Sequence, residues 1–208
     1  MSNEIRTFNI SLLGESSVGK TCIFHVFEEK KDFNTENVVA TIGIDTNIKT
    51  AKFPDDDKEY RFKIFDTAGQ ERYKSLSYTT IQIADGLLMV FAVDNRESFK
   101  KINEWFTNIS DHIDFKEKVI IIVGNKIDLE KRQVEKEEGE EFAKKMGFKY
   151  RETSAKTGEG TKEVFQEIFK DIYERYKKQN HNNNDKSIKL DRKKHKKNKI
   201  SNFFKKVC

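Results

Sequence analysis

Two segments of the chain are apolar at nearly every position, GLLMVFAV at residues 86–93 and VIIIVG at residues 119–124. Successive side chains of a strand point to opposite faces of a sheet, so an unbroken apolar run indicates a strand that is buried on both faces. Such strands are typical of parallel sheets covered by helices. The spacing of apolar residues elsewhere predicts further strands at 8–13, 60–65 and 148–154, and helices at 20–29, 98–112, 136–146 and 162–178.

The only proline, Pro54, lies between two extended runs within residues 45–65. A Pro-Asp turn between such runs predicts a hairpin that adds one antiparallel strand to the sheet. We therefore expect an α/β fold with a six-stranded, mostly parallel sheet, one antiparallel strand and helices on both faces. In folds of this class, ligands bind at the carboxyl ends of the parallel strands.

The net charge is distributed unevenly along the chain. The whole sequence has a net charge of +5, whereas Lys186–Cys208 alone has ten basic residues and one acid, a net +9 that leaves −4 for residues 1–185. A nucleic-acid-binding domain carries its positive charge on the folded surface, so this distribution favours a tether to an anionic membrane surface. We expect one domain at residues 1–178 and a disordered polybasic tail at 179–208. A solvated charge run and a nuclear localisation signal are the alternative interpretations.

Two cysteines, Cys22 and Cys208, do not make a disulfide framework, which favours a reducing, cytoplasmic compartment. The N-terminus has no apolar signal core, and no window is apolar enough to span a bilayer. We interpret the Cys22 side chain as a packed residue of the first helix rather than a redox sensor.

The segment GESSVGKT at residues 14–21 fits the pattern G-x-x-x-x-G-K-[ST], follows a predicted strand and opens a predicted helix. In such a loop the backbone N–H groups turn inward, the lysine adds a positive charge and the helix N-terminus favours an anion. The loop therefore predicts a phosphate site, without identifying the nucleotide. Its expected phosphate-binding residues are Gly14, Ser16, Ser17, Val18, Gly19, Lys20, Thr21 and Cys22.

The segment NKID at residues 125–128 follows the strand at 119–124. Asp128 there can accept hydrogen bonds from the paired N–H donors of a guanine edge, while Lys126 packs over the base and Asn125 braces the loops. In TSAK at residues 153–156, N–H groups around Ala155 are suited to the guanine carbonyl. Taken alone, NKID also fits an ordinary turn rich in polar residues.

The segment DTAGQE at residues 66–71 follows the strand at 60–65. Asp66 is placed to hold Mg²⁺ through water, Gly69 leaves room for its N–H to meet a terminal phosphate, and Gln70 is a candidate to orient the attacking water. A tight turn is the alternative interpretation of this segment.

With TIGID at residues 41–45, these segments make the chain similar to the small GTPases of the Ras superfamily over residues 6–178. TIGID, FKIFDTAGQERYKS and a basic tail that ends in cysteine resemble the Rab branch most. The resemblance implies a P-loop NTPase fold and slow GTP hydrolysis with Mg²⁺, in a switch between GTP and GDP forms that regulates vesicle trafficking. It implies that Thr21, Thr41 and Asp66 hold the metal, that Gln70 and Lys20 are catalytic, and that Phe33, Ser154, Ala155 and Lys156 contact the nucleotide.

The resemblance also implies that the protein is a monomer. Its expected partners are an exchange factor, a GTPase-activating protein, an escort or GDP-dissociation-inhibitor-like chaperone, and effectors. Prenylation of Cys208 would attach the protein reversibly to the cytoplasmic face of endomembranes. Thr46, Phe65 and Thr80 stand where Rab proteins usually have effector-reading aromatic residues, which leaves the choice of effectors open. The rival interpretations are a GTP-binding scaffold without turnover, another branch of the superfamily, and a metabolic P-loop kinase.

Overall fold

A computed structural model of the chain describes residues 5–29, 44–67, 74–110 and 113–180. Several predicted site residues lie outside these ranges: Phe33, Thr41, Gly69, Gln70 and Cys208. The chain divides into two units, Met1–Lys170 and Asp171–Cys208.

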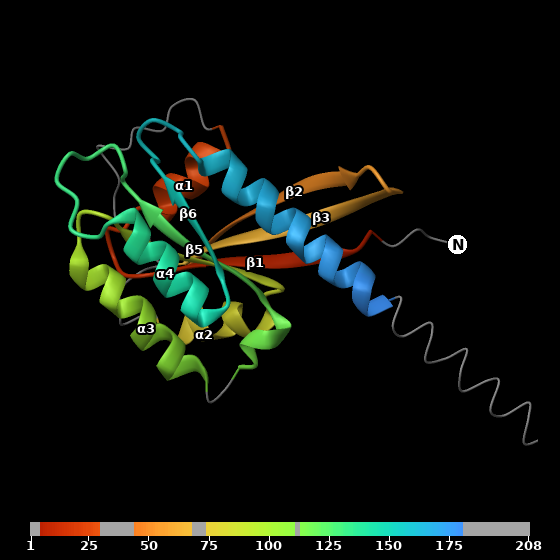
Figure 1. Cartoon of the computed structure of the whole chain (residues 1–208). Coiled ribbons are helices and arrows are strands. Elements are labelled where there is room, and N and C mark those ends of the chain that lie inside the picture. The colour runs from red at the N-terminus through yellow and green to blue at the C-terminus, as the bar shows by residue number, and fades with distance from the viewer. Residues whose placement is uncertain (1–4, 30–43, 68–73, 111–112, 181–208) are drawn as a thin grey trace, which may run out of the picture. The chain divides into compact units, whose positions relative to one another are not determined.

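The first unit is built around one six-stranded sheet in the order β2-β3-β1-β4-β5-β6 (Figure 1). Strand β2 pairs antiparallel with β3, and every other neighbouring pair is parallel. This arrangement confirms the predicted mostly parallel sheet and its single antiparallel strand, which the hairpin around Pro54 supplies. The strands are β1 (Thr7–Leu13), β2 (Ile44–Phe53), β3 (Asp56–Thr67), β4 (Gly86–Ala92), β5 (Val119–Asn125) and β6 (Lys149–Thr153).

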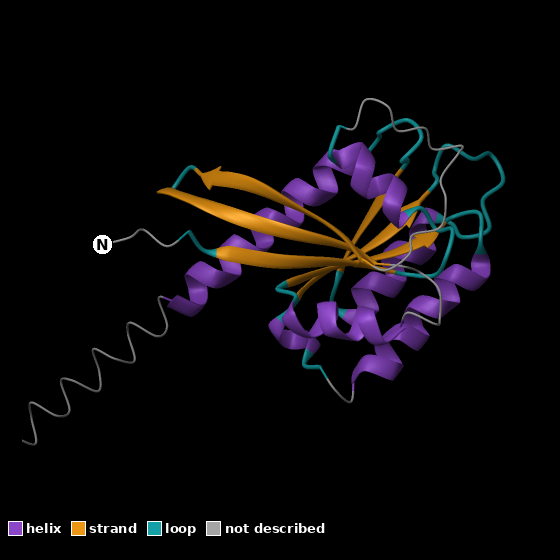
Figure 2. Ribbon diagram, turned by 180° about the vertical axis from the view of Figure 1, so that it is seen from behind, coloured by secondary structure: helices purple, strands orange, loops and turns teal. Residues whose placement is uncertain are grey.

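Helices cover both faces of the sheet, as predicted (Figures 1 and 2). On one side lie α1 (Lys20–Phe27) and residues 161–170, the part of the last helix that belongs to this unit. On the other side lie α2 (Lys74–Ile83), α3 (Arg96–Ser110) and α4 (Lys136–Met146), with a short 3₁₀ helix, η2 (Phe115–Glu117), before β5. Helix α2 was not predicted, because its polar sequence has no clear apolar stripe.

The central strands are buried on both faces, as their unbroken apolar sequences indicate. Every residue of β4 is buried, and its side chains alternate between the two sides of the sheet. Leu87, Met89 and Phe91 join the core formed with α3 and α4, in which Trp105 and Ala143 also pack.

Aromatic rings fill the core on the opposite side of the sheet. The Phe27 ring of α1 stacks on Phe165 with 4.0 Å between centroids, and the Phe62 ring of β3 stacks on Phe169 at 4.1 Å. The apolar residues of the helix predicted at 162–178 pack in this core at Val164, Phe165, Ile168 and Phe169, which are all buried.

Within the second unit, residues 171–180 are helical, and the Lys177 ammonium lies over the Tyr173 ring at 5.5 Å. Among the residues described in both units, no helix has the length and apolarity needed to cross a membrane.

Candidate nucleotide site

The loop between β1 and α1 needs glycine at both of its ends. Gly14 has φ +143° and Gly19 has φ +95°, backbone conformations that other residues rarely adopt. A Cβ atom on Gly14 would lie 2.1 Å from the carbonyl oxygen of Val90, and one on Gly19 would lie 2.3 Å from Nδ2 of Asn125. The two glycines therefore hold the loop against the ends of β4 and β5, where α1 begins with Lys20.

Lys20 is buried inside this loop. Its Nζ donates hydrogen bonds to the carbonyl oxygens of Gly14, at 2.9 Å, and Glu15, at 2.8 Å. Burial lowers the pKa of Lys20 to about 8, although the negative charges of Asp66 and Glu15 act in the opposite direction. The ammonium group thus lies in a poorly hydrated position where an added anion interacts with it strongly.

Thr21 and Asp66 meet beside the loop. The Thr21 hydroxyl donates to Oδ2 of Asp66 at 2.6 Å, and Oδ1 of Asp66 is buried without a hydrogen-bond partner in the part of the chain that the structure describes. Burial raises the pKa of this fully buried carboxyl, against the opposing effects of Thr21 and Lys20. A hydroxyl beside a carboxylate oxygen that lacks a donor is a ligand set that fits Mg²⁺.

Asn125, at the end of β5, connects three loops. Its Nδ2 donates to the carbonyl oxygen of Val18 in the phosphate loop at 2.8 Å. Its Oδ1 accepts from the Thr153 hydroxyl at 3.0 Å and from the backbone N–H of Ala155 at 3.2 Å. Asn125 thus joins the phosphate loop to the segment at residues 153–155.

A second contact joins NKID to TSAK. The Ser154 hydroxyl donates to Oδ1 of Asp128 at 2.6 Å and accepts from the backbone N–H of Thr157 at 3.1 Å. Ser154 is buried, whereas Asp128 is exposed at the edge of the site. One oxygen of the Asp128 carboxylate is thus held by the Ser154 hydroxyl.

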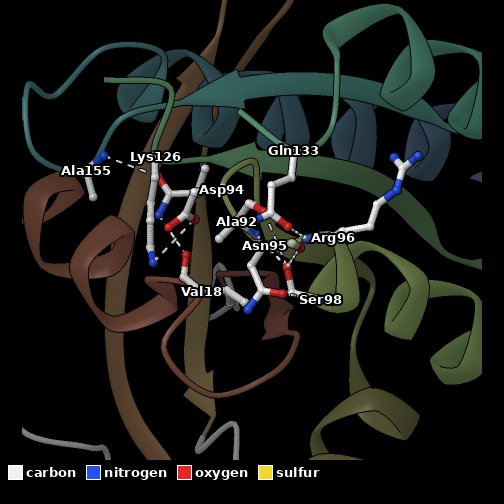
Figure 3. Close-up of polar contacts among 10 residues, drawn as sticks. Val18, Ala92, Asp94, Asn95, Arg96, Ser98, Lys126, Gln133 and Ala155 are labelled. Carbon is white, nitrogen blue, oxygen red and sulfur yellow. Dashed lines mark hydrogen bonds and ion pairs between the residues drawn. The ribbon is translucent and has the colours of Figure 1, made fainter. Parts of the chain in front are cut away.

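An acidic residue that no sequence motif contains lies close to Lys126. Oδ1 of Asp94, in the turn after β4, lies 3.6 Å from Nζ of Lys126, and both side chains are about one-third exposed, at 31% and 33% (Figure 3). The turn is held by Gln133, whose Oε1 accepts from the backbone N–H of Arg96 at 3.0 Å. Asp94 belongs to no motif, so only the fold brings it to Lys126.

Other predicted residues are placed less centrally. Lys156 is exposed after Ala155, and Cys22 is half-buried in α1, where burial raises its pKa. Of the three positions expected to contact effectors, Thr46 is exposed, whereas Phe65 and Thr80 are buried. The Thr80 hydroxyl lies 3.0 Å from that of Ser11, so this side chain joins α2 to the sheet.

Comparison with known proteins identifies the family, because residues 9–174 match the Ras family. The chain belongs to the Ras family. Ras-related protein Rab-8B from Homo sapiens is 40% identical over 166 residues, which cover 79% of this chain and 78% of that protein. Ras-related protein Rab-8 from Diplobatis ommata is 40% identical over 177 residues, which cover 85% and 82% of the two chains. For Rab-8A from Bos taurus the identity is 39% over 166 residues, with 79% and 78% covered.

Membership of the Ras family makes the chain a small GTPase, an enzyme that hydrolyses GTP, and its similarity is to Rab-8 proteins. This confirms the family, the fold and the enzyme class that the sequence motifs predict.

Proposed function

We propose that this Ras-family protein is a Rab-type switch that binds GTP or GDP with Mg²⁺, hydrolyses GTP slowly and regulates vesicle transport at membranes. The observation that carries the proposal is the meeting of two groups of residues at the carboxyl ends of the parallel strands. Lys20, Thr21 and Asp66 form one group, and Asn125 and Asp128 belong to the other. The first suits phosphates and the second suits a guanine base.

On the phosphate side, Lys20 now donates to two backbone carbonyl oxygens, which are weaker acceptors than a phosphate anion. A bound nucleotide would replace them with phosphate oxygens, while backbone N–H groups of the loop and of the start of α1 donate to the same phosphates. Thr21 and Asp66 would hold Mg²⁺, which offsets the negative charge of the phosphate oxygens when it is bound. Thr41 is the further proposed ligand, engaged only with GTP.

In the hydrolytic step, we assign Gln70 to orient the attacking water and the N–H of Gly69 to meet the terminal phosphate. Lys20 stabilises the charge that develops on the transferred group. No arginine of the sequence has an evident position as an internal finger, so a GTPase-activating protein would supply one and raise the rate by about 10³- to 10⁵-fold. An exchange factor, a chaperone of the GDP-dissociation-inhibitor type and effectors are the other expected partners.

On the base side, Asp128 would accept the two neighbouring N–H donors of guanine, and the N–H of Ala155 would donate to the guanine carbonyl. Lys126 and Phe33 would pack against the base. Lys156 extends the same loop.

Membrane attachment would combine two weak signals. One prenyl chain on Cys208 anchors only marginally, and the basic residues before it add roughly 1 kcal/mol each near an anionic leaflet. Together they would hold the protein reversibly on the cytoplasmic face of endomembranes. Mass spectrometry of the C-terminal peptide from cells tests this part, and an unmodified Cys208 would contradict it.

The decisive test of base recognition is the substitution Asp128→Asn. It replaces an acceptor by a group that can also donate, so the preference should move from GDP toward XDP, whose base carries a carbonyl in place of the amino group. We expect GDP affinity to fall on the order of a hundredfold or more, because the two N–H donors of guanine lose a charged acceptor. Glu130→Gln, at an exposed acid two residues away, is the matched control and should change neither affinity. An unchanged preference in Asp128→Asn would contradict the proposal.

A further inference from the structure

Arg132, Tyr150 and Glu152 form a cluster around one ion pair, close in the sequence to NKID and TSAK but in neither motif. Nη2 of Arg132 lies 2.5 Å from Oε1 of Glu152, Nη1 lies 3.4 Å from Oε2, and the Tyr150 hydroxyl donates to the same Oε1 at 2.9 Å. The side chains of Arg132 and Glu152 are 23% and 14% exposed. We call these three residues the Tyr150 cluster.

The geometry of the cluster makes it rigid. Arg132 presents two nitrogens to the two carboxylate oxygens, and its Nε donates to the carbonyl oxygen of Val134 at 3.2 Å. A forked, partly buried pair of this kind fixes direction as well as distance. Burial raises the pKa of Tyr150, and the adjacent Glu152 carboxylate raises it further, so the phenol stays protonated and donates.

Two glycines confine the Tyr150 ring. A Cβ atom on Gly124 of β5 would lie 2.5 Å from the Tyr150 hydroxyl, and a Cβ atom on Gly139 of α4 would lie 2.5 Å from Cζ of the ring. The ring therefore fits into a slot between β5 and α4 that exists only because both positions lack a side chain. Its hydroxyl is held at the Glu152 carboxylate.

The cluster is linked to Asp128 through the chain on both sides. Arg132 lies in the same connection as Asp128, between β5 and α4, and Glu152 lies in β6 two residues before Ser154. Ser154 in turn donates to Asp128 at 2.6 Å. The connection between β5 and α4 is thus joined twice to β6 and the loop that follows it. Asp128 and Ser154 make one contact, and Arg132 and Glu152 make the other.

We propose that Arg132, Tyr150 and Glu152 are positioning residues that set where the Asp128 carboxylate lies and thereby control discrimination for the amino group of guanine. The inference rests on the proposed role of Asp128 in base recognition. Without the Arg132–Glu152 pair, the connection that carries Asp128 can move relative to Ser154. The carboxylate then loses its alignment with the two N–H donors of the base, and the hydrogen bond to the amino group weakens.

The test compares GDP with IDP, which has the same ribose and phosphates but lacks the 2-amino group. Dissociation constants of both nucleotides are measured with Mg²⁺ for the full chain and for Glu152→Gln, which keeps the shape of the side chain and removes its charge. The wild-type chain should prefer GDP, and in Glu152→Gln the ratio of IDP to GDP dissociation constants should fall by about tenfold, the worth of one hydrogen bond to a charged group.

The chain offers a matched control on the same strand. Arg151, next to Glu152, makes a forked pair with Glu167, with Nε at 2.7 Å from Oε2 and Nη2 at 2.7 Å from Oε1. The Glu167 side chain is 19% exposed, close to the value for Glu152. Glu167 also accepts from Nζ of Lys149 at 2.9 Å. Glu167→Gln therefore removes the charge that pairs with both Arg151 and Lys149 while leaving Asp128, Ser154 and the Tyr150 cluster intact, so the GDP preference should stay at the wild-type value.

The possible results distinguish a failure of the positioning role from a failure of base recognition by Asp128. If Glu152→Gln weakens GDP and IDP equally, the cluster only supports the fold, and the inference is overturned while base recognition stands. If the wild-type chain itself shows no preference for GDP over IDP, the proposed role of Asp128 fails and the inference fails with it. Should Glu152→Gln not fold, Tyr150→Phe decides. That variant keeps the ring in its slot, and its ratio should fall about threefold for one lost hydrogen bond, whereas an unchanged ratio overturns the inference.

Discussion

Lys20 is the residue whose environment is least like that of an ordinary surface lysine. It is only 4% exposed, and its ammonium is held by two backbone carbonyl oxygens rather than by a carboxylate. Burial lowers its pKa to about 8, which means that the charged form is less stable here than in water. A bound anion would stabilise that form. Part of the affinity of this loop for phosphate should therefore come from stabilisation of the charged Lys20 ammonium when the anion binds.

This gives a pH-dependent prediction for proton uptake. Phosphate oxygens favour the charged ammonium and raise its pKa, so GDP binding should take up part of a proton at about pH 9 and none at Lys20 near pH 6.5. Calorimetry of GDP binding in two buffers with different ionisation enthalpies measures the uptake. Lys20→Arg, whose guanidinium stays charged at both pH values, is the control and should show none. Equal uptake by both proteins at the higher pH would refute this role for Lys20.

Among the helices, α4 shows how a distant packing contact can outweigh local preference. Alanine stabilises the interior of a helix relative to glycine by about 1 kcal/mol, so Gly139→Ala looks favourable from the sequence. In the fold, the new Cβ would lie 2.5 to 2.8 Å from atoms of the Tyr150 ring. That ring has no room to withdraw, because Gly124 borders it on the other side.

We therefore expect Gly139→Ala to lower the free energy of unfolding by about 1 to 2 kcal/mol, the cost of overpacking less the gain in helix propensity. Urea denaturation followed by circular dichroism measures it. Glu141→Ala, at an exposed position of the same helix, should change the free energy by less than about 0.5 kcal/mol. A Gly139→Ala protein more stable than the wild type would mean that the Tyr150 slot is not tightly packed.

Sequence patterns predicted the strands and most helices because their apolar residues repeat with regular periods. They placed Lys20, Asn125 and Asp128 in the site because these residues lie in short contiguous motifs. Helix α2 was missed, since its sequence has no strong apolar period and it is joined to β1 through the hydroxyl contact of Thr80.

Asp94 and the Arg132–Glu152 pair could not be predicted for a different reason. Each interacts with a residue on another strand or connection, 32 positions away for Asp94 and 20 for Arg132. Only the strand order brings these partners together. The sequence therefore predicts which residues face the nucleotide better than it predicts which residues hold them in place.

For the whole protein, the separation of charge between residues 1–185 and Lys186–Cys208 is the dominant electrostatic feature of the sequence. Residues 1–185 have a net charge of −4 and Lys186–Cys208 one of +9. An anionic bilayer should attract Lys186–Cys208 and repel the acidic remainder of the chain, which favours attachment through this basic segment.

The full chain without lipid should therefore bind vesicles rich in phosphatidylserine but not vesicles of phosphatidylcholine. Binding should fall as salt rises from about 0.1 M to about 1 M, because the screening length shortens from roughly 10 Å to roughly 3 Å. Co-sedimentation measures it. A full-length variant with Lys193, Lys194, Lys196 and Lys197 changed to glutamine should bind more weakly. Equal binding to both kinds of vesicle would argue against an electrostatic tether.

The proposed switch requires that the terminal phosphate of GTP change the surface that partners meet. Amide hydrogen exchange of the full chain, loaded with Mg²⁺ and either GDP or a non-hydrolysable GTP analogue, tests it most directly. We predict slower exchange with the GTP analogue in peptides that contain Thr41 and Gly69, and equal exchange in β4 and β5. The same exchange in every peptide for both nucleotides would show that the protein does not switch.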